Sequence, residues 1–467
     1  MGDSCDMQFL MVLLIAAANI SAQRIPQRSV PDWIESGPMI GHVSSSTAKV
    51  WVRVAKGVEL RARATLGGST ARVGVVTKLG DRIRMVEFDD LRSDTDLLVQ
   101  LYQAKMPTRG VAVSIRTATA PLTFGRVRIG FGSCLNDVLY NKFPVFLGVA
   151  KERPDMFLFV GDNTYYVRTW KDPDGKRKMS TTGPKGEWST QKQMFARQMS
   201  TRNNPWMQPL LGSVPCYAVW DDHDYGPNNA DRLFANKKKA LKVFKQMWAN
   251  PSYGVKGTKG CFSTFRRGPV QVFLMDCRYH KYVKTRAHPK VSDKDCQIWG
   301  KEQLDWLCAH LEASDAPIKL IANGTQFLYQ GKTGEGHYQE ARREYQTLLD
   351  YLHKQRIGGV VFLTGDRHHT ELMHVKRTDG PEVIDFTSSP LGQNQTVGVY
   401  SGERQPTAVW TMRGDSFGLV TVDVTKEGTG TITFDARDTN NGIAVVHGLP
   451  CKTTWKLADL QYSKTGK

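Results

Sequence analysis

Residues 364–369 read TGDRHH and place an acid, a guanidinium and two imidazoles directly after the apolar run of residues 360–363. Carboxylates and imidazoles are common metal ligands, and imidazoles also exchange protons near neutral pH. A turn or a solvated loop would use the same residue types without any chemistry. The other polar segments of the chain decide between a metal site and a loop.

Four other apolar runs also end in polar side chains. In open α/β sheets, ligands bind beyond the carboxyl ends of the strands. So many carboxylates would repel one another there, and bound cations are the usual remedy. The sequence therefore predicts a metal site at these strand ends. The polar side chains that would converge there are Cys134 after residues 127–133, Asp162, Asn163, Tyr165 and Tyr166 after 156–160, Asp221, Asp222, His223 and Asp224 after 216–220, Gln326 after 318–323, and Asp366 with His368 after 360–363.

Each motif alone has a structural explanation. A single Asp after a strand is often a turn or helix cap, and Cys134 could be a small buried apolar residue. His369 beside His368 is expected to be structural or outward-facing, because neighbours on a strand point to opposite sides. Other catalytic templates are absent, since GKTGEG near Lys332 is no P-loop and the chain has no HExxH or GxSxG motif.

Two different patterns of apolar residues divide the chain and predict the elements that position these residues. From about residue 31 to 117, short alternating strands follow one another without a helical period, which predicts an antiparallel β-sandwich over residues 27–118. From residue 126, strand-like runs alternate with helical patterns, which predicts an α/β domain with stacked sheets over residues 126–455. The alternation at residues 417–448 is expected to complete a sheet of that domain. The polar, Gly- and Pro-containing segment 171–188 is expected to be a loop over the site or on the surface.

Charge and the N-terminus bear on partners and location. The 467 residues carry 63 Lys and Arg against 45 Asp and Glu, which suits either solubility or attraction of anionic partners such as phosphorylated molecules or surface polymers. No basic module with interleaved aromatics occurs, so no stable nucleic-acid complex is expected. The apolar residues 9–18 are shorter than the roughly 20 that span a bilayer and precede small residues, which predicts a signal peptide over 1–22, no transmembrane segment, and a secreted or periplasmic protein.

The chain has eight cysteines, of which Cys5 lies in the predicted signal peptide. No Cys-x-x-Cys pair occurs, so a zinc ribbon is not expected. Cys134 is the candidate for a separate role at a strand end. The remaining six are available for disulfide bonds, as in exported proteins.

The order of motifs FGSC, GDNTYY, WDDHDYGPNN, NGTQ, TGDRHHTEL and TSSPL resembles the PhoD-type alkaline phosphatase/phosphodiesterase family of the calcineurin-like metallophosphatases. Ordinary metallophosphatases have D-x-H and G-H-x-H where this chain has GSC and GDRH, and the PhoD-type branch makes the same replacements. The resemblance implies an N-terminal β-sandwich followed by a four-layer αββα metallophosphatase domain. It covers nearly the whole chain from about residue 31.

The resemblance also implies two metal sites. A thiolate, a phenolate and carboxylates suit Fe³⁺, whereas oxygen-rich ligation suits Ca²⁺, with Mg²⁺, Mn²⁺ and Zn²⁺ as alternatives in the second site. Asp162 would bridge the two ions. The first ion would be held by Cys134, Asp162, Tyr165 and Asp366, and the second by Asp162, Asp222 and His368, completed by Asn228 or Gln326.

The implied activity is that of a secreted metal-dependent phosphoester hydrolase. Two adjacent cations would lower the pKa of a shared water for in-line attack on phosphorus. His223 would donate a proton to the leaving oxygen, and Arg367 would clamp phosphate unless it forms a surface salt bridge instead. Two alternatives stay open, namely a phospholipase D-like lipid phosphodiesterase and a non-catalytic binding protein stabilised by metal.

Overall fold

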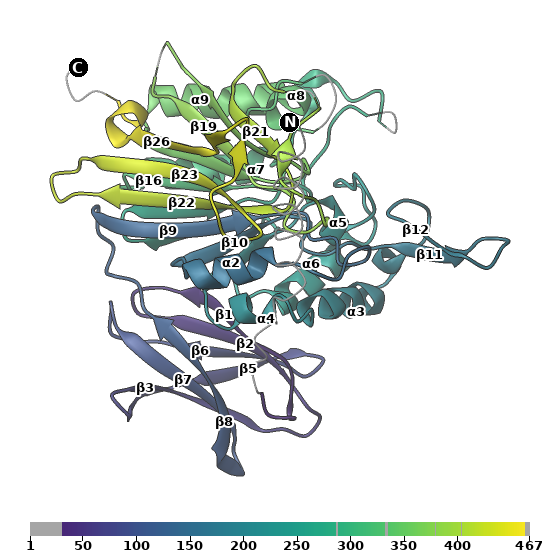
Figure 1. The fold of residues 1–467 in the computed structure, drawn as a ribbon, viewed down its shortest axis with the longest axis vertical. Coiled ribbons are helices and arrows are strands. Elements are labelled where there is room, and N and C mark those ends of the chain that lie inside the picture. Colours follow the sequence, from purple (N-terminus) through teal and green to yellow (C-terminus); the bar gives the residue numbers. More distant parts are fainter. Residues whose placement is uncertain (1–29, 286–287, 332–334, 379, 403, 463–467) are drawn as a thin grey trace, which may run out of the picture.

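The computed structural model describes residues 30–285, 288–331, 335–378, 380–402 and 404–462 (Figure 1). The predicted signal peptide, residues 1–22, lies outside the described residues. No helix in the described part of the chain is long and apolar enough to cross a membrane.

The N-terminal part is an antiparallel β-sandwich, as the alternating pattern predicts. The sheets enclose a core that includes Val50, Val52, Val99 and Val113, because alternate residues of each strand face inward. One sheet has the order β1 (Ile34–Val43), β2 (Ala48–Val54), β6 (Ile83–Phe88), β5 (Val75–Gly80), and the other β4 (Ser69–Val73), β3 (Leu60–Leu66), β7 (Asp96–Gln103), β8 (Met106–Arg116).

The larger part of the chain contains a six-stranded and an eight-stranded sheet. The six-stranded sheet has the order β13 (Cys216–Val219), β10 (Met156–Val160), β9 (Gly125–Gly132), β22 (Ser416–Val424), β23 (Gly430–Asp438), β26 (Lys452–Lys456). Strands β13, β10 and β9 are parallel to one another, whereas β22, β23 and β26 add to them in antiparallel fashion. The late alternating strands therefore extend the sheet begun by β9 and form no separate domain.

The eight-stranded sheet supplies the other row of strand ends. Its order is β14 (Ser263–Arg267), β15 (Val270–Leu274), β16 (Ile318–Ala322), β17 (Val360–Thr364), β19 (Val383–Thr387), β18 (Thr370–Val375), β21 (Ala408–Arg413), β20 (Gly398–Val399). Strands β15, β16, β17 and β19 are parallel. Parallel strands are buried on both faces, which explains their continuous apolar runs.

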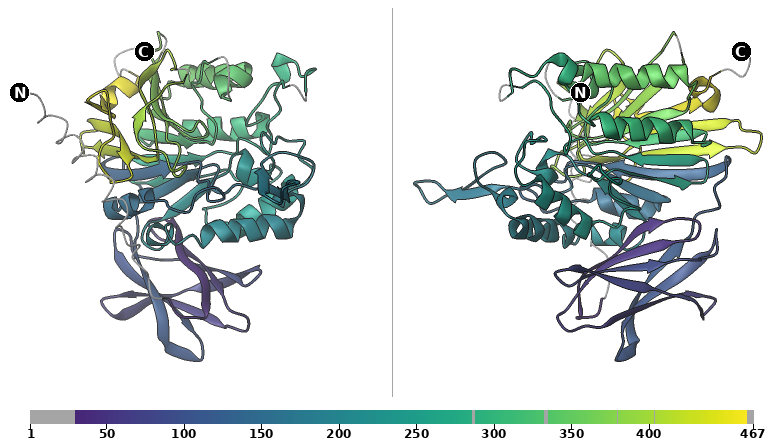
Figure 2. Two further views of the ribbon diagram at one scale, coloured as in Figure 1. Left: turned by 45° about the vertical axis from the view of Figure 1, so that its right-hand side comes forward. Right: turned by 180° about the vertical axis from the view of Figure 1, so that it is seen from behind.

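The two sheets pack against each other with helices outside (Figure 2). Leu320 and Leu363 of the eight-stranded sheet share a core with Ile129 and Leu158 of the six-stranded one. The opposite face of the eight-stranded sheet, including Phe362, is covered by α7 (Lys301–Glu312) and α9 (Arg342–Lys354). On the side of the six-stranded sheet lie the short helices α2 (Val145–Glu152), α3 (Gln191–Arg202), α4 (Gln208–Leu211) and α6 (Lys237–Met247).

The sandwich is fixed to the larger part through α6 and the segment after it. The indole Nε1 of Trp51 donates a hydrogen bond to the Gln246 carbonyl at 2.7 Å, and the His42 amide donates to the Ala249 carbonyl at 2.8 Å. Trp51 is fully buried and belongs to the core that also holds the six-stranded sheet. The junction is therefore packed like a protein interior.

Segment 171–188 is not a plain loop. Strands β11 (Arg168–Lys171) and β12 (Arg177–Ser180) pair as a hairpin that projects from the body of the molecule (Figure 1). The Asp-Pro-Asp-Gly sequence of residues 172–175 makes the turn, and Gly175 adopts the positive φ of 78° that glycine tolerates best. The remainder leads into a single 3₁₀ turn, Glu187–Ser189.

The disulfide prediction is not supported by the structure. All seven described cysteines are free and buried: Cys134, Cys216, Cys261, Cys277, Cys296, Cys308 and Cys451. Apart from Cys134 and from Cys277, whose thiol donates to Asp221 Oδ1 at 3.3 Å, they serve as small residues of the packed interior, the common environment of an unpaired cysteine.

Candidate metal centre

The strand ends of both sheets meet at one edge and bring the predicted side chains together. Cys134 follows β9, Asp162 follows β10, Asp222 follows β13 at the start of the single helical turn α5 (Asp222–Tyr225), and Asp366 follows β17. Because these strands run parallel within their sheets, their carboxyl ends point to the same crevice.

Asp162 lies at the centre of the group. Its Oδ2 accepts hydrogen bonds from the Cys134 thiol at 3.6 Å and from the Tyr165 hydroxyl at 3.2 Å. Its Oδ1 accepts from the backbone amide of His223 at 3.2 Å. The Tyr165 hydroxyl also lies 3.3 Å from Nε2 of His368, so this phenol connects the two sides of the crevice.

Two triads of potential ligand atoms adjoin this group. Atoms of Asp162, Asp222 and His223 all lie within 4.8 Å of one another, and so do atoms of Asp221, Asp222 and Asp366. Asp222 belongs to both triads. Its Oδ2 accepts a hydrogen bond from the Asn229 amide at 2.6 Å, which helps to fix the carboxylate between them.

Four of these residues have unusual backbone conformations. Cys134, Asp162, Asp366 and His368 have φ values of 59°, 51°, 73° and 52°, in the left-handed region that disfavours side chains. Each such residue costs on the order of 1 kcal/mol, and such strain persists where the surrounding structure enforces it, often at functional sites.

The electrostatics of the crevice favour a bound cation. Burial, and then the carboxylates of Asp222 and Asp221, raise the pKa of the Asp162 carboxyl well above its ordinary value. Burial, and then the neighbouring acids, likewise raise the pKa values of Asp366 and of the Cys134 thiol. A bound positive ion would reduce the repulsion among these groups and favour their charged forms.

Arg278 is the one buried guanidinium among the described side chains that pair with this acid group. It is fully buried, pairs with Asp221, and its Nη2 lies 3.7 Å from Asp222 Oδ1 and 2.8 Å from Glu335 Oε2. Burial alone would raise the pKa of Asp222, but His223 and Arg278 hold it below its ordinary value.

Neither Arg278 nor its partner Glu335 is predicted from the sequence. Arg278 follows the apolar run of residues 270–275 in the same way that the candidate ligands follow theirs, and this signal could have found it. Glu335 comes from a loop and carries no such signal. Glu335 also pairs with Lys281 at 2.6 Å, and Lys281 pairs with Glu340 at 3.0 Å. A row of ion pairs therefore extends from Arg278 away from the crevice.

Three other predicted site residues make their described contacts outside these triads. The Gln326 amide donates to Thr387 Oγ1 at 2.7 Å and to Glu371 Oε2 at 3.4 Å, within the buried polar interior. Asn228 is exposed, and it is the amide of the next residue, Asn229, that contacts Asp222. Arg367 stacks its guanidinium 4.3 Å from the Tyr329 ring centroid, and its Nε is buried without a hydrogen-bond partner in the described structure.

A hollow adjoins the acid group on the side of Asn229. Its volume is 620 Å³, and its wall includes Asn228, Phe234, Lys281 and Glu335. Because Asn229 contacts Asp222 and Glu335 contacts Arg278, this hollow opens beside the potential ligands. Its size suits the organic part of a small substrate.

Comparisons with known proteins agree with this architecture. The PhoD-like phosphatase family model matches residues 129–441, more than half of the chain. A solved structure of PhoD aligns with a TM-score of 0.72 at 16% identity, covering 93% of this chain and 94% of that one. The purple acid phosphatase PPD1 from yellow lupin (Lupinus luteus) seeds aligns with a TM-score of 0.62 at 10% identity, covering 89% and 73%. At these identities the two structures show the shared fold alone. No curated protein matches the chain.

Proposed function

The chain belongs to the PhoD-like phosphatase family, whose members are phosphoric ester hydrolases, and we propose that its strand-end crevice is a two-metal active site. The observation that supports this best is the charge imbalance. Five carboxylates, those of Asp162, Asp221, Asp222, Asp366 and Glu335, lie here with a thiol and a phenol, and the buried cations that pair with them among the described residues are Arg278 and Lys281.

We propose that one ion is held by Cys134, Asp162, Tyr165 and Asp366, and a second by Asp162, Asp222 and His368. A thiolate, a phenolate and two carboxylates carry enough negative charge for Fe³⁺, and the mixed oxygen and imidazole set accommodates Ca²⁺. Bound cations would supply positive charge for the phosphoryl oxygens and would make a water molecule acidic. We propose that Asn228, which lines the adjoining hollow, or Gln326, whose amide oxygen is buried without a hydrogen-bond partner in the described structure, completes the second site.

The chain's own residues prepare this site in two ways. The Asn229 amide and Arg278 fix the Asp222 carboxylate, so the side chain is oriented before substrate binds. The backbone amide of His223 holds Asp162, which leaves the His223 ring free for another task.

We assign proton donation to the leaving oxygen to His223. Its ring stacks on Tyr165 at 4.3 Å between centroids, which fixes the ring plane at the crevice. Its Nδ1 is buried and has no hydrogen-bond partner in the described structure, and one of its ring nitrogens lies within 4.8 Å of atoms of Asp162 and Asp222. A histidine in such a place is suited to general acid catalysis.

Arg367 is our candidate for phosphate binding. It forms no ion pair with a carboxylate of the described residues, so the salt-bridge alternative has no support. Tyr329 holds its guanidinium by a cation–π contact, and planar guanidinium groups bind phosphate oxygens in pairs.

We further propose that residues 27–118 and 126–455 are the two domains of an exported enzyme whose residues 1–22 are a signal peptide. The sandwich strands end at Arg116 and β9 begins at Gly125, which is consistent with a boundary between them. Mass spectrometry of the N-terminus of the protein recovered from its native source would test the removal of residues 1–22.

Hydrolysis assays with a small phosphomonoester and a small phosphodiester test the proposal directly. The metal-free protein should be inactive, and activity should return with iron and calcium together more than with either ion alone. Activity restored equally by zinc, manganese or magnesium alone would overturn the iron and calcium assignment. Hydrolysis of neither ester with any of these ions would overturn the proposed site.

A further inference from the structure

Lysines line a groove where α6 meets the β-sandwich. Lys238, Lys242 and Lys245 of α6, together with Lys259, surround a hollow of 320 Å³. Leu79 of β5 contributes from the sandwich side. No aspartate or glutamate lines this hollow, so its charge has a single sign.

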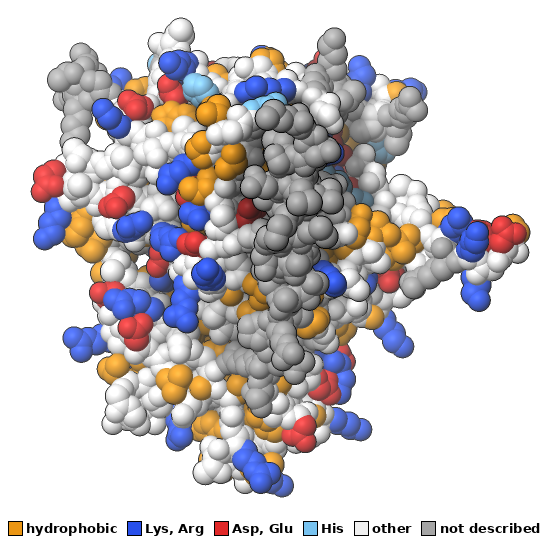
Figure 3. Space-filling view, in the orientation of Figure 1, with side chains coloured by type: hydrophobic (Ala, Val, Ile, Leu, Met, Phe, Trp, Pro, Cys, Tyr) orange, Lys and Arg blue, Asp and Glu red, His pale blue; other side chains and the backbone are white. Residues whose placement is uncertain are grey.

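These four lysines are not neutralised by the protein. Within the described part of the chain, none of their ammonium groups forms an ion pair with a carboxylate, whereas Lys49 pairs with Glu87 at 3.2 Å and Lys301 with Asp305 at 2.5 Å. Figure 3 shows the ordinary pattern on one face of the molecule, where Lys and Arg side chains are interspersed with Asp and Glu. The groove departs from this pattern, and an uncompensated cluster attracts anions.

The backbone beneath the lysines is rigid. Val243, Phe244 and Met247 bury the opposite face of α6 in the core, and the helical period places residues 238, 242 and 245 on one face. Gln246 donates to the Leu79 carbonyl at 2.7 Å and fastens the helix to the sandwich. The axial rise between Lys238 and Lys245 is about 10 Å, longer than a single oxyanion.

A ligand for this groove needs several anionic groups along its length. Burial, and then Lys259, lower the pKa of Lys245, so these two ammonium groups lie close enough to repel each other. Single-stranded nucleic acids bind such surfaces by stacking bases on exposed aromatic rings. The one aromatic residue of the groove, Tyr279, is only 6% exposed and offers no such platform.

We propose that this groove binds a sulfated polysaccharide and holds the enzyme at an anionic surface. The choice of sulfate rests on the proposed function, because a polymer of phosphate esters would itself be a substrate and would be cut. Lysine ammonium groups bind oxyanions as flexible point charges, which suits a polymer with repeating sulfates. The groove shares no residue with the strand-end crevice, so the active site stays free while the polymer is bound.

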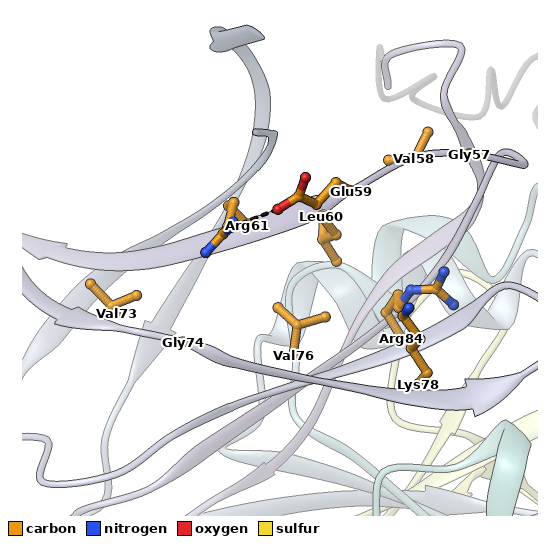
Figure 4. A pocket seen from close by; sticks show the side chains of 10 residues that line it. All are labelled: Gly57, Val58, Glu59, Leu60, Arg61, Val73, Gly74, Val76, Lys78 and Arg84. Carbon is orange, nitrogen blue, oxygen red and sulfur yellow. Dashed lines mark hydrogen bonds and ion pairs between the residues drawn. The ribbon is translucent and has the colours of Figure 1, made fainter. Parts of the chain in front are cut away.

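The larger hollow on the sandwich does not have this character. It measures 620 Å³ and lies between β3 and the strands β4 and β5 (Figure 4). Its wall contains Val58, Val73 and Val76, and Arg61 is paired there with Glu59 at 2.6 Å. Mixed charge and apolar side chains give it no preference for a polyanion.

Binding of fluorescent heparin fragments to the purified metal-replete protein tests the proposal at an ionic strength of about 0.15 M. The variant with Lys238→Gln, Lys242→Gln and Lys245→Gln should bind about tenfold more weakly than the wild type. The control variant with Lys56→Gln, Lys105→Gln and Lys192→Gln removes the same charge from exposed positions elsewhere and should bind within about twofold of the wild type. Both variants should hydrolyse a small phosphate ester at the wild-type rate and unfold at the same temperature.

Equal losses of heparin affinity in the two variants would show attraction by net charge alone and would overturn the proposal that the groove binds the polymer. Unchanged binding by the α6 variant would overturn it as well, and so would stronger competition by polyphosphate or single-stranded DNA than by unlabelled heparin. If the wild type hydrolyses no phosphate ester, the proposed function fails, while the heparin measurement still decides whether the groove binds a polyanion.

Discussion

Acidic residues occur in opposite settings in the β-sandwich and at the strand ends. In the sandwich, Glu35 faces Arg53 at 2.9 Å and Arg82 at 2.5 Å, and Arg116 faces both Asp94 and Asp96 at 2.9 Å. At the strand ends, the carboxylates of Asp221, Asp222 and Glu335 share the guanidinium of Arg278, whereas those of Asp162 and Asp366 form no ion pair with a cationic side chain of the described residues. These sandwich acids have guanidinium partners within the fold, whereas the described acids of the crevice outnumber the buried cations that pair with them.

The contrast also concerns burial. The Arg116 side chain is 55% exposed, and exposed ion pairs contribute less than about 1 kcal/mol. Arg278 is fully buried, and breaking a buried pair leaves a charge without compensation. The same residue types therefore serve solubility in one region and a chemical site in the other.

Asp162→Asn should give the largest effect. Loss of the central carboxylate, which the Cys134 thiol and the Tyr165 hydroxyl both contact, should lower kcat/KM by roughly 10⁴-fold, or about 5 kcal/mol. Bound metal per chain should fall as well. Asp94→Asn in the sandwich is the matched control and should leave activity within about twofold. Equal activities of the two variants would contradict the claim that the crevice carboxylates, unlike those of the sandwich, take part in catalysis.

Arg278→Met should have the second largest effect. It leaves Asp221, Asp222 and Glu335 without their shared cation and should lower the free energy of unfolding by about 3–5 kcal/mol. Arg116→Met, its exposed counterpart, should cost less than about 1 kcal/mol. Urea unfolding of the metal-free proteins measures both values. A small loss for Arg278→Met would mean that the buried acids are protonated and need no partner.

The junction between the two regions provides a pH-dependent test. Burial, and then Lys49 and Arg267, lower the pKa of His42 from 6.5 to about 4. Between pH 6.5 and 4 the unfolded chain takes up a proton that the folded chain does not, so stability falls as pH falls through this range. Relative to His42→Gln, the wild type should lose about 3 kcal/mol between pH 7 and pH 4. A constant difference across these pH values would contradict the burial of this histidine at the junction.

His223→Ala should have the smallest effect of the four. General acid catalysis contributes about 100-fold or more to a rate, so kcat should fall by about that factor while bound metal is unchanged. For an ester whose leaving group needs no proton, kcat should fall much less. His447→Ala, an exposed histidine far along the chain, is the control. Full turnover by His223→Ala would remove this residue from the mechanism.

The sequence predicts the main features of the site because local patterns encode them. Apolar runs ending in polar residues place Cys134, Asp162, Asp222 and Asp366 at one edge, and the structure brings these four together with Tyr165, His223 and His368. The motif order predicts the family, which the family model confirms. Alternation without a helical period predicts the sandwich.

Other features depend on contacts that no local pattern encodes. Arg278 reaches Glu335 across 57 positions, and neither residue type in isolation indicates a buried pair. Gln326 follows a strand like the other candidates, and the contacts of its amide nitrogen with Thr387 and Glu371 are not predicted by that pattern. The hairpin of residues 168–180 has strand pairing that a polar composition conceals. The free cysteines show that an even number of candidates does not by itself predict pairing.

The most direct test of the central claim is the metal content of the purified protein by elemental mass spectrometry, compared with that of Asp162→Asn. The two-metal proposal predicts about two ions per wild-type chain, one of them iron with a visible charge-transfer band, and a marked loss in the variant. If the wild-type protein takes up no metal even after reconstitution, or if Asp162→Asn retains the full content, the acids at the strand ends hold no ions and the claim is contradicted.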